Sequence, residues 1–135
     1  MKTQTFKFNK LVRDKICQKL LDNNIKVKTA LLDSPEAILP YFQAKLREEA
    51  SEVAEASTVG AIAAELADCL EVIHGLLAHL KISWEALEQL RLDKRVSYGG
   101  FQKGTVVDTI TLVADNPAMN YYLQNPAKYP QVNDA

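Results

Sequence analysis

The pattern of apolar and polar residues along the chain predicts a protein made mainly of helices. Apolar residues recur every three to four positions over residues 41–56 and 61–81, which is the spacing of an amphipathic helix. A third helix is expected over residues 84–97, with Leu87 and Leu90 as its inward anchors. These three helices should therefore supply most of the core.

Shorter elements are expected before and after these helices. Residues 34–36 have the character of a helix start, and Pro40 either ends a short turn or bends one continuous helix. Alternating residues over 25–31 and β-branched residues over 105–113 predict short strands or extended segments that could pair. The expected fold class is an all-α helical bundle with at most a minor β hairpin or extended segments.

The length of the chain suits one domain, because it has 135 residues. We expect that domain to cover residues 1–114. From residue 115 to 135 the sequence is rich in Asn, Pro and Tyr, which indicates an extended C-terminal tail.

Composition and charge narrow the possible functions. The net charge is −1 with both signs interspersed, so the chain lacks the basic surface of a nucleic-acid-binding protein. It has no apolar run of about 18 residues and no apolar segment near its start, so neither a membrane span nor a signal peptide is expected. Cys17 and Cys69 are isolated on helical faces, which favours reduced thiols and a cytoplasmic location.

One acidic residue of the first long helix lies on the apolar side of that helix. At about 100° per residue, Glu49 projects from the middle of the apolar stripe, between Phe42 and Ala56. Burying an unpaired carboxylate there costs several kcal/mol (roughly) or forces it to take up a proton. Glu49 therefore needs a partner that the surrounding apolar residues cannot provide.

The second long helix repeats this anomaly. Glu65 lies at the rim of its apolar face, and Asp68 follows one turn later on the same side. The face itself consists of Ile62, Leu66, Cys69, Leu70, Ile73, Leu77 and Leu80. If residues 57–60 form a tight turn, the helices run antiparallel and the two acidic pairs stand at the same height. We expect Glu49 and Glu52 to meet Glu65 and Asp68, a cluster that proteins usually hold together with cations.

The arrangement Glu-Glu-x-x-Glu, a spacer of about a dozen residues, then Glu-x-x-Asp resembles the signature of the all-α nucleoside triphosphate pyrophosphohydrolases. These include the MazG and phosphoribosyl-ATP pyrophosphohydrolase types. The run Asn-Lys-Leu-Val-Arg-Asp-Lys at residues 9–15 resembles the N-terminal motif of a branch expected to contain house-cleaning enzymes. Lys94 and the Gly-Gly-Phe at residues 99–101 resemble its C-terminal motif, although Tyr98 stands where that motif has arginine.

The resemblance implies a helical bundle that assembles as a dimer or tetramer, with its site near a partner subunit. It also implies Mg²⁺ and cleavage between the α and β phosphates, which releases a nucleoside monophosphate and pyrophosphate. Base and sugar preference stay open at this point, with non-canonical nucleotides and phosphoribosyl-ATP-like compounds as the substrates considered.

Roles follow for individual residues. By their spacing and by the family pattern, the expected metal ligands are Glu49, Glu52, Glu65 and Asp68. Glu48 is expected to act as the general base or to support the ligands. Five basic residues are candidates for binding substrate phosphates: Lys10, Arg13, Lys15, Lys94 and Arg95. Lys45 lies one turn before Glu49 and is expected to pair with it or with phosphate.

Two other interpretations fit the same residues. The chain could be a catalytically silent helical dimer that acts as a binding or regulatory module, with structural acidic residues. It could also bind divalent cations without turning over a nucleotide. Replacement of Glu49 by Gln would separate these cases, because only an enzyme would lose pyrophosphate release while staying folded.

Overall fold

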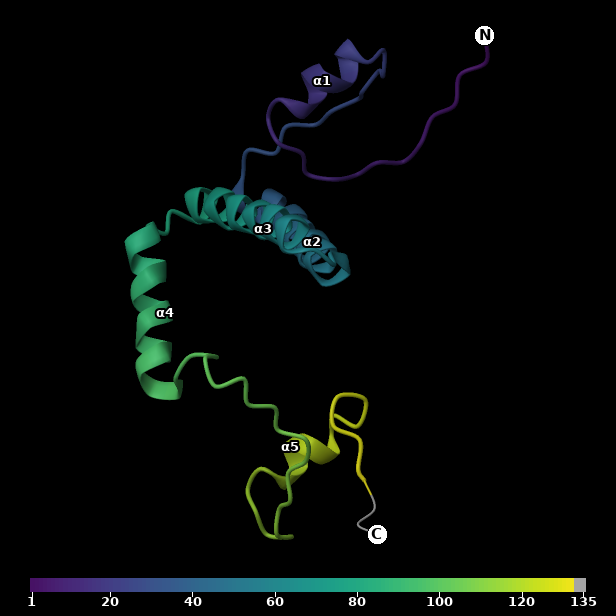
Figure 1. Ribbon diagram of the computed structural model, residues 1–135. Helices are drawn as coiled ribbons and strands as arrows, with labels where there is room; N and C mark the ends of the chain where they lie inside the picture. Colours follow the sequence, from purple (N-terminus) through teal and green to yellow (C-terminus); the bar gives the residue numbers. More distant parts are fainter. Residues whose placement is uncertain (133–135) are drawn as a thin grey trace. The chain divides into compact units, whose positions relative to one another are not determined.

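The computed structural model describes residues 1–132 and is helical. It contains α1 (Ile16–Asp22), α2 (Pro35–Glu55), α3 (Val59–Leu80), α4 (Trp84–Tyr98) and α5 (Met119–Leu123), as Figure 1 shows. Residues 1–132 contain no strand, so the all-α expectation is confirmed. None of the helices in this range is long and apolar enough to cross a membrane.

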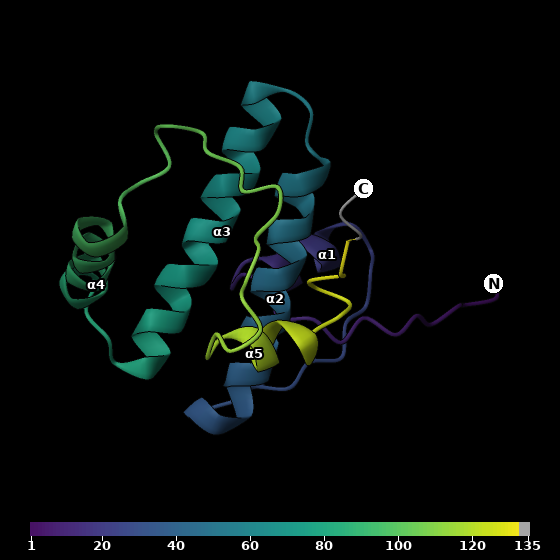
Figure 2. The same cartoon turned by 90° about the horizontal axis from the view of Figure 1, so that it is seen from below.

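The chain divides into two compact units, the first from Met1 to Ser97 and the second from Tyr98 onward. In the first unit, α2 and α3 make the extensive helix–helix contact and lie side by side in Figure 2. A turn at residues 56–58 joins them, so the two helices form an antiparallel hairpin. This hairpin carries the residues on which the functional argument rests.

Hydrogen bonds at the helix ends explain where the hairpin begins and turns. The Ser34 hydroxyl accepts a hydrogen bond from the Ala37 N–H at 3.1 Å, and Pro35 occupies the first turn. The Thr58 hydroxyl does the same for the Ala61 N–H at 3.1 Å, which fixes the start of α3. Of the two possibilities at Pro40, the structure has one continuous helix, so α2 starts before Pro40 and runs through it.

The buried apolar core of the first unit is small. Within residues 1–132 its buried members are Ile38 and Phe42 on α2 and Leu77 on α3. Phe42 packs closely on α3, because a Cβ atom added at Gly75 would lie 2.9 Å from the Phe42 Cε1 atom. The absence of a side chain at Gly75 therefore lets the two helices approach each other here.

Several expected core positions are exposed instead. Leu66 and Leu70 were expected on the apolar face of α3, but they are 53% and 45% exposed. Leu90 was expected to anchor α4 and is 59% exposed, whereas Leu87 is half-buried. The prediction for Leu90 was wrong because periodicity identifies an apolar face of a helix but not the element that covers it.

Of the two possibilities for residues 25–31 and 105–113, short strands or extended segments, the structure shows no strand. Neither range has regular secondary structure. Val106 and Ile110 are exposed, so the β-branched side chains of the second segment find no packed surface. β-propensity is largely a preference for such a surface, and it does not create a strand where a neighbouring strand is missing.

The second unit contains α5 and a group of tyrosines. The rings of Tyr121, Tyr122 and Tyr129 pack with centroids 4.9 to 5.8 Å apart. Asn116 accepts a hydrogen bond from the Ala118 N–H at 2.8 Å just before the helix. An extended segment was expected here, but Met119–Leu123 is helical, because local tyrosine packing and this polar contact favour a turn of helix.

Candidate functional site

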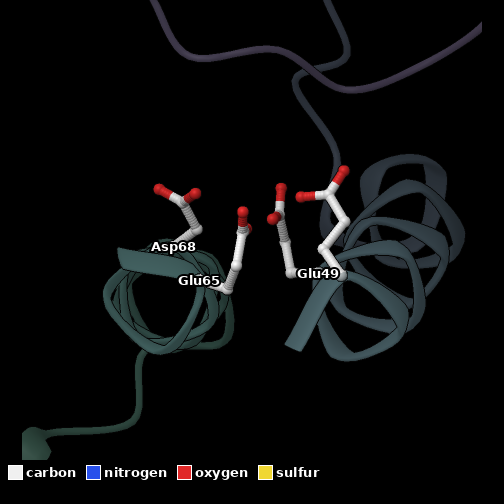
Figure 3. A group of neighbouring side chains, drawn as sticks. Glu49, Glu65 and Asp68 are labelled. Atoms are coloured by element: carbon white, nitrogen blue, oxygen red, sulfur yellow. The ribbon is translucent and has the colours of Figure 1, made fainter. Parts of the chain in front are cut away.

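Four carboxylates meet between α2 and α3. Glu49 and Glu52 come from α2, and Glu65 and Asp68 come from α3. Each offers one carboxylate oxygen, and these oxygens all lie within 4.8 Å of one another. Figure 3 shows the labelled side chains rising from facing helices toward a common region. The predicted convergence of these four acidic residues is therefore confirmed; we call them the carboxylate cluster.

The sequence produces the cluster in two steps. Residues three positions apart lie on the same side of a helix, so Glu49 stands beside Glu52 and Glu65 beside Asp68. The short turn capped by Thr58 then folds α3 back along α2. Because the acidic pairs are at similar distances from this turn, folding back brings them to the same level.

Glu49 is the most deeply placed member. It is only 7% exposed and is buried among the residues of the hairpin core, as its position on the helical wheel predicts. Its Oε1 atom lies 3.3 Å from the Lys45 ammonium, which confirms that these two residues pair. Burial raises the pKa of Glu49, and the neighbouring Glu52 carboxyl raises it further, although Lys45 acts in the opposite direction.

Two buried oxygens of the cluster have no hydrogen-bond partner among the described residues: Glu49 Oε2 and Glu65 Oε2. A buried acceptor without a partner is costly, and more so when it carries charge. Hard divalent cations such as Mg²⁺ prefer carboxylate oxygens. The donor set and its unpaired oxygens thus fit a divalent metal ion.

The N-terminal segment provides cations at this site. In Figure 3 it crosses the hairpin on the side toward which the labelled carboxylates point. Arg13 Nη2 donates to Asp68 Oδ1 at 2.7 Å, and Lys10 Nζ donates to Glu48 Oε1 at 3.2 Å. Two of the five basic residues expected to bind phosphate therefore lie next to the acidic residues, and both are paired with them.

Glu48 lies beside the cluster rather than in it. Lys10 and Lys45 both approach its carboxylate, Lys45 Nζ at 3.6 Å from Oε2. Burial alone would raise the pKa of Glu48, but the hydrogen bond from Lys10 and the charges of both lysines outweigh burial and lower it. Glu48 therefore contacts two ammonium groups beside the cluster.

The other three expected phosphate-binding residues are not brought to the cluster. Lys15, Lys94 and Arg95 are exposed, and in the described part of the chain they form no ion pair with any of the four carboxylates. Lys94 and Arg95 lie on α4, whereas the extensive helix–helix contact found within residues 1–132 is that between α2 and α3. Sequence proximity to a motif did not determine where these long side chains lie.

Two features of the site were missed by the sequence analysis. The Tyr41 hydroxyl donates to Asn9 Oδ1 at 3.4 Å, and Asn9 adopts a left-handed backbone conformation with φ of 48°. Cys69 lies near the cluster, where burial and then the charges of Glu49, Asp68 and Glu65 raise the pKa of its thiol. Only the position of Asn9 at the start of the N-terminal motif could have pointed to the first feature.

Comparison with known families identifies the chain. The sequence model of the family described as phosphoribosyl-ATP pyrophosphohydrolase matches residues 9–93, which include the N-terminal motif and the whole carboxylate cluster. Comparison with curated proteins and with solved structures gave no match. The chain therefore belongs to the phosphoribosyl-ATP pyrophosphohydrolase family, within the MazG-like all-α superfamily, and is a nucleotide pyrophosphohydrolase, a hydrolase that acts on acid anhydrides.

Proposed function

We propose that this enzyme uses Mg²⁺ to cleave the α–β phosphoanhydride of phosphoribosyl-ATP or a related nucleotide. Water adds across the P–O–P bridge, so the products are a nucleoside monophosphate and pyrophosphate. The observation that carries the proposal is the burial of Glu49 within four converging carboxylates, two of whose buried oxygens lack a hydrogen-bond partner among residues 1–132. Such a site suits a hard divalent cation, because these ions prefer carboxylate oxygens as ligands.

We assign Glu49, Glu52, Glu65 and Asp68 as the residues that would hold the metal. A bound Mg²⁺ offsets negative charge on phosphate oxygens and helps to activate water. The contribution of the protein is to hold these carboxylates at one level of the hairpin. Their i,i+3 spacing on two rigid helices suits that purpose.

Glu48 has two possible roles, general base or support for neighbouring groups. Its contacts with Lys10 and Lys45 favour the second role, because both lysines lower its proton affinity. We propose that Glu48 positions these ammonium groups for substrate phosphate. Arg13 would join them once it leaves Asp68.

We also propose that three exposed basic residues bind substrate phosphate: Lys15, Lys94 and Arg95. They would do so either at a partner subunit or after their side chains move. A dimer or tetramer is supported by the small core and by the exposed leucines of α3, Leu66 and Leu70. Light scattering of the purified protein tests this assembly: a monomer at all concentrations would contradict it.

We also propose a cytoplasmic location, supported by the unpaired Cys17 and Cys69.

The extent of the domain and the choice of substrate complete the proposed function. The family match ends at residue 93. We propose that residues 94–114 belong to the same functional domain. House-cleaning of non-canonical nucleoside triphosphates is the second candidate activity, favoured by the N-terminal motif at residues 9–15. A panel of phosphoribosyl-ATP, canonical triphosphates and damaged triphosphates, assayed for pyrophosphate, distinguishes the two.

The deciding experiment replaces Glu49 by Gln. Pyrophosphate release should fall at least a hundredfold, while helical content by circular dichroism stays unchanged. Glu55→Gln is the matched control, because Glu55 is an exposed acid on the same helix outside the cluster. Unchanged turnover in Glu49→Gln, or equal turnover with Mg²⁺ and with EDTA, would refute the metal-dependent mechanism. A wild-type protein that turns over none of these nucleotides would instead favour the silent binding module.

A further inference from the structure

A groove runs along α2 beside the carboxylate cluster. It consists of two adjoining hollows of about 270 Å³ and 300 Å³, which share Asn9, Tyr41 and Ala44 in their walls. The first hollow extends to Lys45 and Glu48, and the second extends to Pro40. We call this feature the Asn9–Tyr41 groove.

The two ends of the groove differ in chemistry. At one end Lys10 and Lys45 converge on Glu48, and Lys45 also touches Glu49 of the cluster. The other end is at Pro40, and Tyr41 and Ala44 line the stretch that the two hollows share. From Tyr41 to Glu48 the helix rises about 10 Å, so the backbone of Tyr41 is well removed from that of Glu48.

This polarity matches that of a nucleotide, whose phosphates are anionic and whose base is a flat aromatic group. If the phosphates bind at the carboxylate cluster and the lysines, the base lies toward Tyr41. Stacking of bases on aromatic side chains is a common and sequence-tolerant mode of binding. Each hollow is at the small end of the range for ligand pockets, so the groove suits a base and sugar rather than a larger group.

Asn9 is placed to read the edge of that base. Its carboxamide oxygen accepts the Tyr41 hydroxyl at 3.4 Å, which holds the amide against the wall of the groove. A carboxamide can donate to N7 and accept from the exocyclic N6 amino group of adenine, a pairing that guanine and pyrimidines do not offer in the same form. The left-handed backbone of Asn9, with φ of 48°, is a conformation that Asn tolerates better than most residues.

We propose that the Asn9–Tyr41 groove is the base subsite of this enzyme and that it selects adenine nucleotides, with Tyr41 stacking on the base and Asn9 reading its edge. This inference rests on the proposed function, because the position of the phosphates at the cluster sets the direction of the ligand. It assigns the base subsite and the reading of the base to particular residues, which the family match does not do.

The test measures binding of AMP, GMP and CMP to the full-length protein in Mg²⁺ by calorimetry. The wild type should bind AMP at least tenfold more tightly than CMP. Tyr41→Leu should weaken AMP binding about tenfold or more through loss of the stack, and Tyr41→Phe should retain most of it. Asn9→Gly should reduce the preference for AMP over GMP about tenfold.

A matched control accompanies the asparagine variant. Asn24 also has a left-handed backbone, with φ of 60°, but it lies after α1 and does not line the groove. Asn24→Gly should leave AMP binding unchanged, which separates loss of the Asn9 side chain from the general effect of a new glycine. Circular dichroism of each variant establishes that it is folded.

Equal binding of the three nucleotides by the wild type, or no binding of AMP, would overturn the inference. So would wild-type affinity for AMP in Tyr41→Leu. The proposed function is judged separately by Glu49→Gln. If Glu49→Gln abolishes pyrophosphate release while Tyr41→Leu leaves both AMP affinity and the KM for phosphoribosyl-ATP unchanged, the metal-dependent mechanism stands and the base subsite is wrong.

Discussion

Arg13 and Asp68 form an ion pair of 2.7 Å between residues 55 positions apart in the sequence. The pair ties the N-terminal segment to α3 at one of the four residues assigned to metal binding. A metal ion that took Asp68 as a ligand would share its carboxylate with the guanidinium, so the two positive charges would compete electrostatically. The N-terminal segment and the proposed metal site are thereby linked.

The first prediction concerns this competition. Arg13→Gln should increase affinity for Mg²⁺ about two- to fivefold, because an exposed ion pair contributes up to about 1 kcal/mol. The same variant should raise the KM for the nucleotide if Arg13 binds phosphate. Calorimetric titration with Mg²⁺ measures the first effect; Lys15→Gln serves as control, and equal affinity in Arg13→Gln and wild type would show that the pair does not compete with the metal.

The second prediction uses the burial of Glu49. Without metal, Glu49→Gln should stabilise the protein by about 1 kcal/mol, or roughly 2–6 °C in Tm, because a buried charge with an unpaired oxygen is removed. With Mg²⁺ the order should reverse, since only the wild type gains from binding. Thermal denaturation in EDTA and in Mg²⁺ measures both, and a destabilised variant in EDTA would contradict the expected cost of Glu49.

The third prediction is the pH dependence of metal-free stability. The folded protein raises the pKa of Glu49, so the folded state binds this proton more tightly than the unfolded state. Its favourable contribution is present below the unfolded pKa of about 4.5 and is lost as pH rises through the folded pKa. Urea denaturation in EDTA from pH 4 to 7, compared between wild type and Glu49→Gln, should show this loss only in the wild type.

The fourth prediction tests the close approach of α2 and α3. Gly75→Ala should destabilise the protein by about 1 kcal/mol net, because overpacking against Phe42 exceeds the gain in helix propensity. Gly60 is the matched control: it lies on the same helix, and no atom of the described residues is within 4 Å of a Cβ added there. Gly60→Ala should be neutral or mildly stabilising, and an equal effect of both substitutions would argue against tight packing at Gly75.

Helical periodicity made the carboxylate cluster predictable. The direction of Glu49 follows from its distance to Phe42 and Ala56 along one helix, and a short turn fixes the level of Glu65 and Asp68. These relationships are local, so sequence spacing determines them almost completely. The all-α class followed from the same periodicity.

Contacts between distant segments were not predictable in this way. No spacing rule relates Arg13 to Asp68 or Asn9 to Tyr41, because flexible side chains and an irregular segment form these contacts. The exposed position of Leu90 was missed for the same reason, since the pattern cannot identify the surface that a helix faces. Strand formation over residues 105–113 failed because it needed a partner strand.

The turn at residues 56–58 also bears on how the protein folds. It brings together four anionic groups spread over about 20 residues, and so short a loop closes on the microsecond timescale or faster. Arg13 reaches Asp68 of the cluster, and Lys10 reaches the neighbouring Glu48, only through long-range contacts, which form more slowly. The hairpin should therefore experience its strongest self-repulsion early in folding, and Mg²⁺ in a refolding buffer should accelerate refolding as well as slow unfolding.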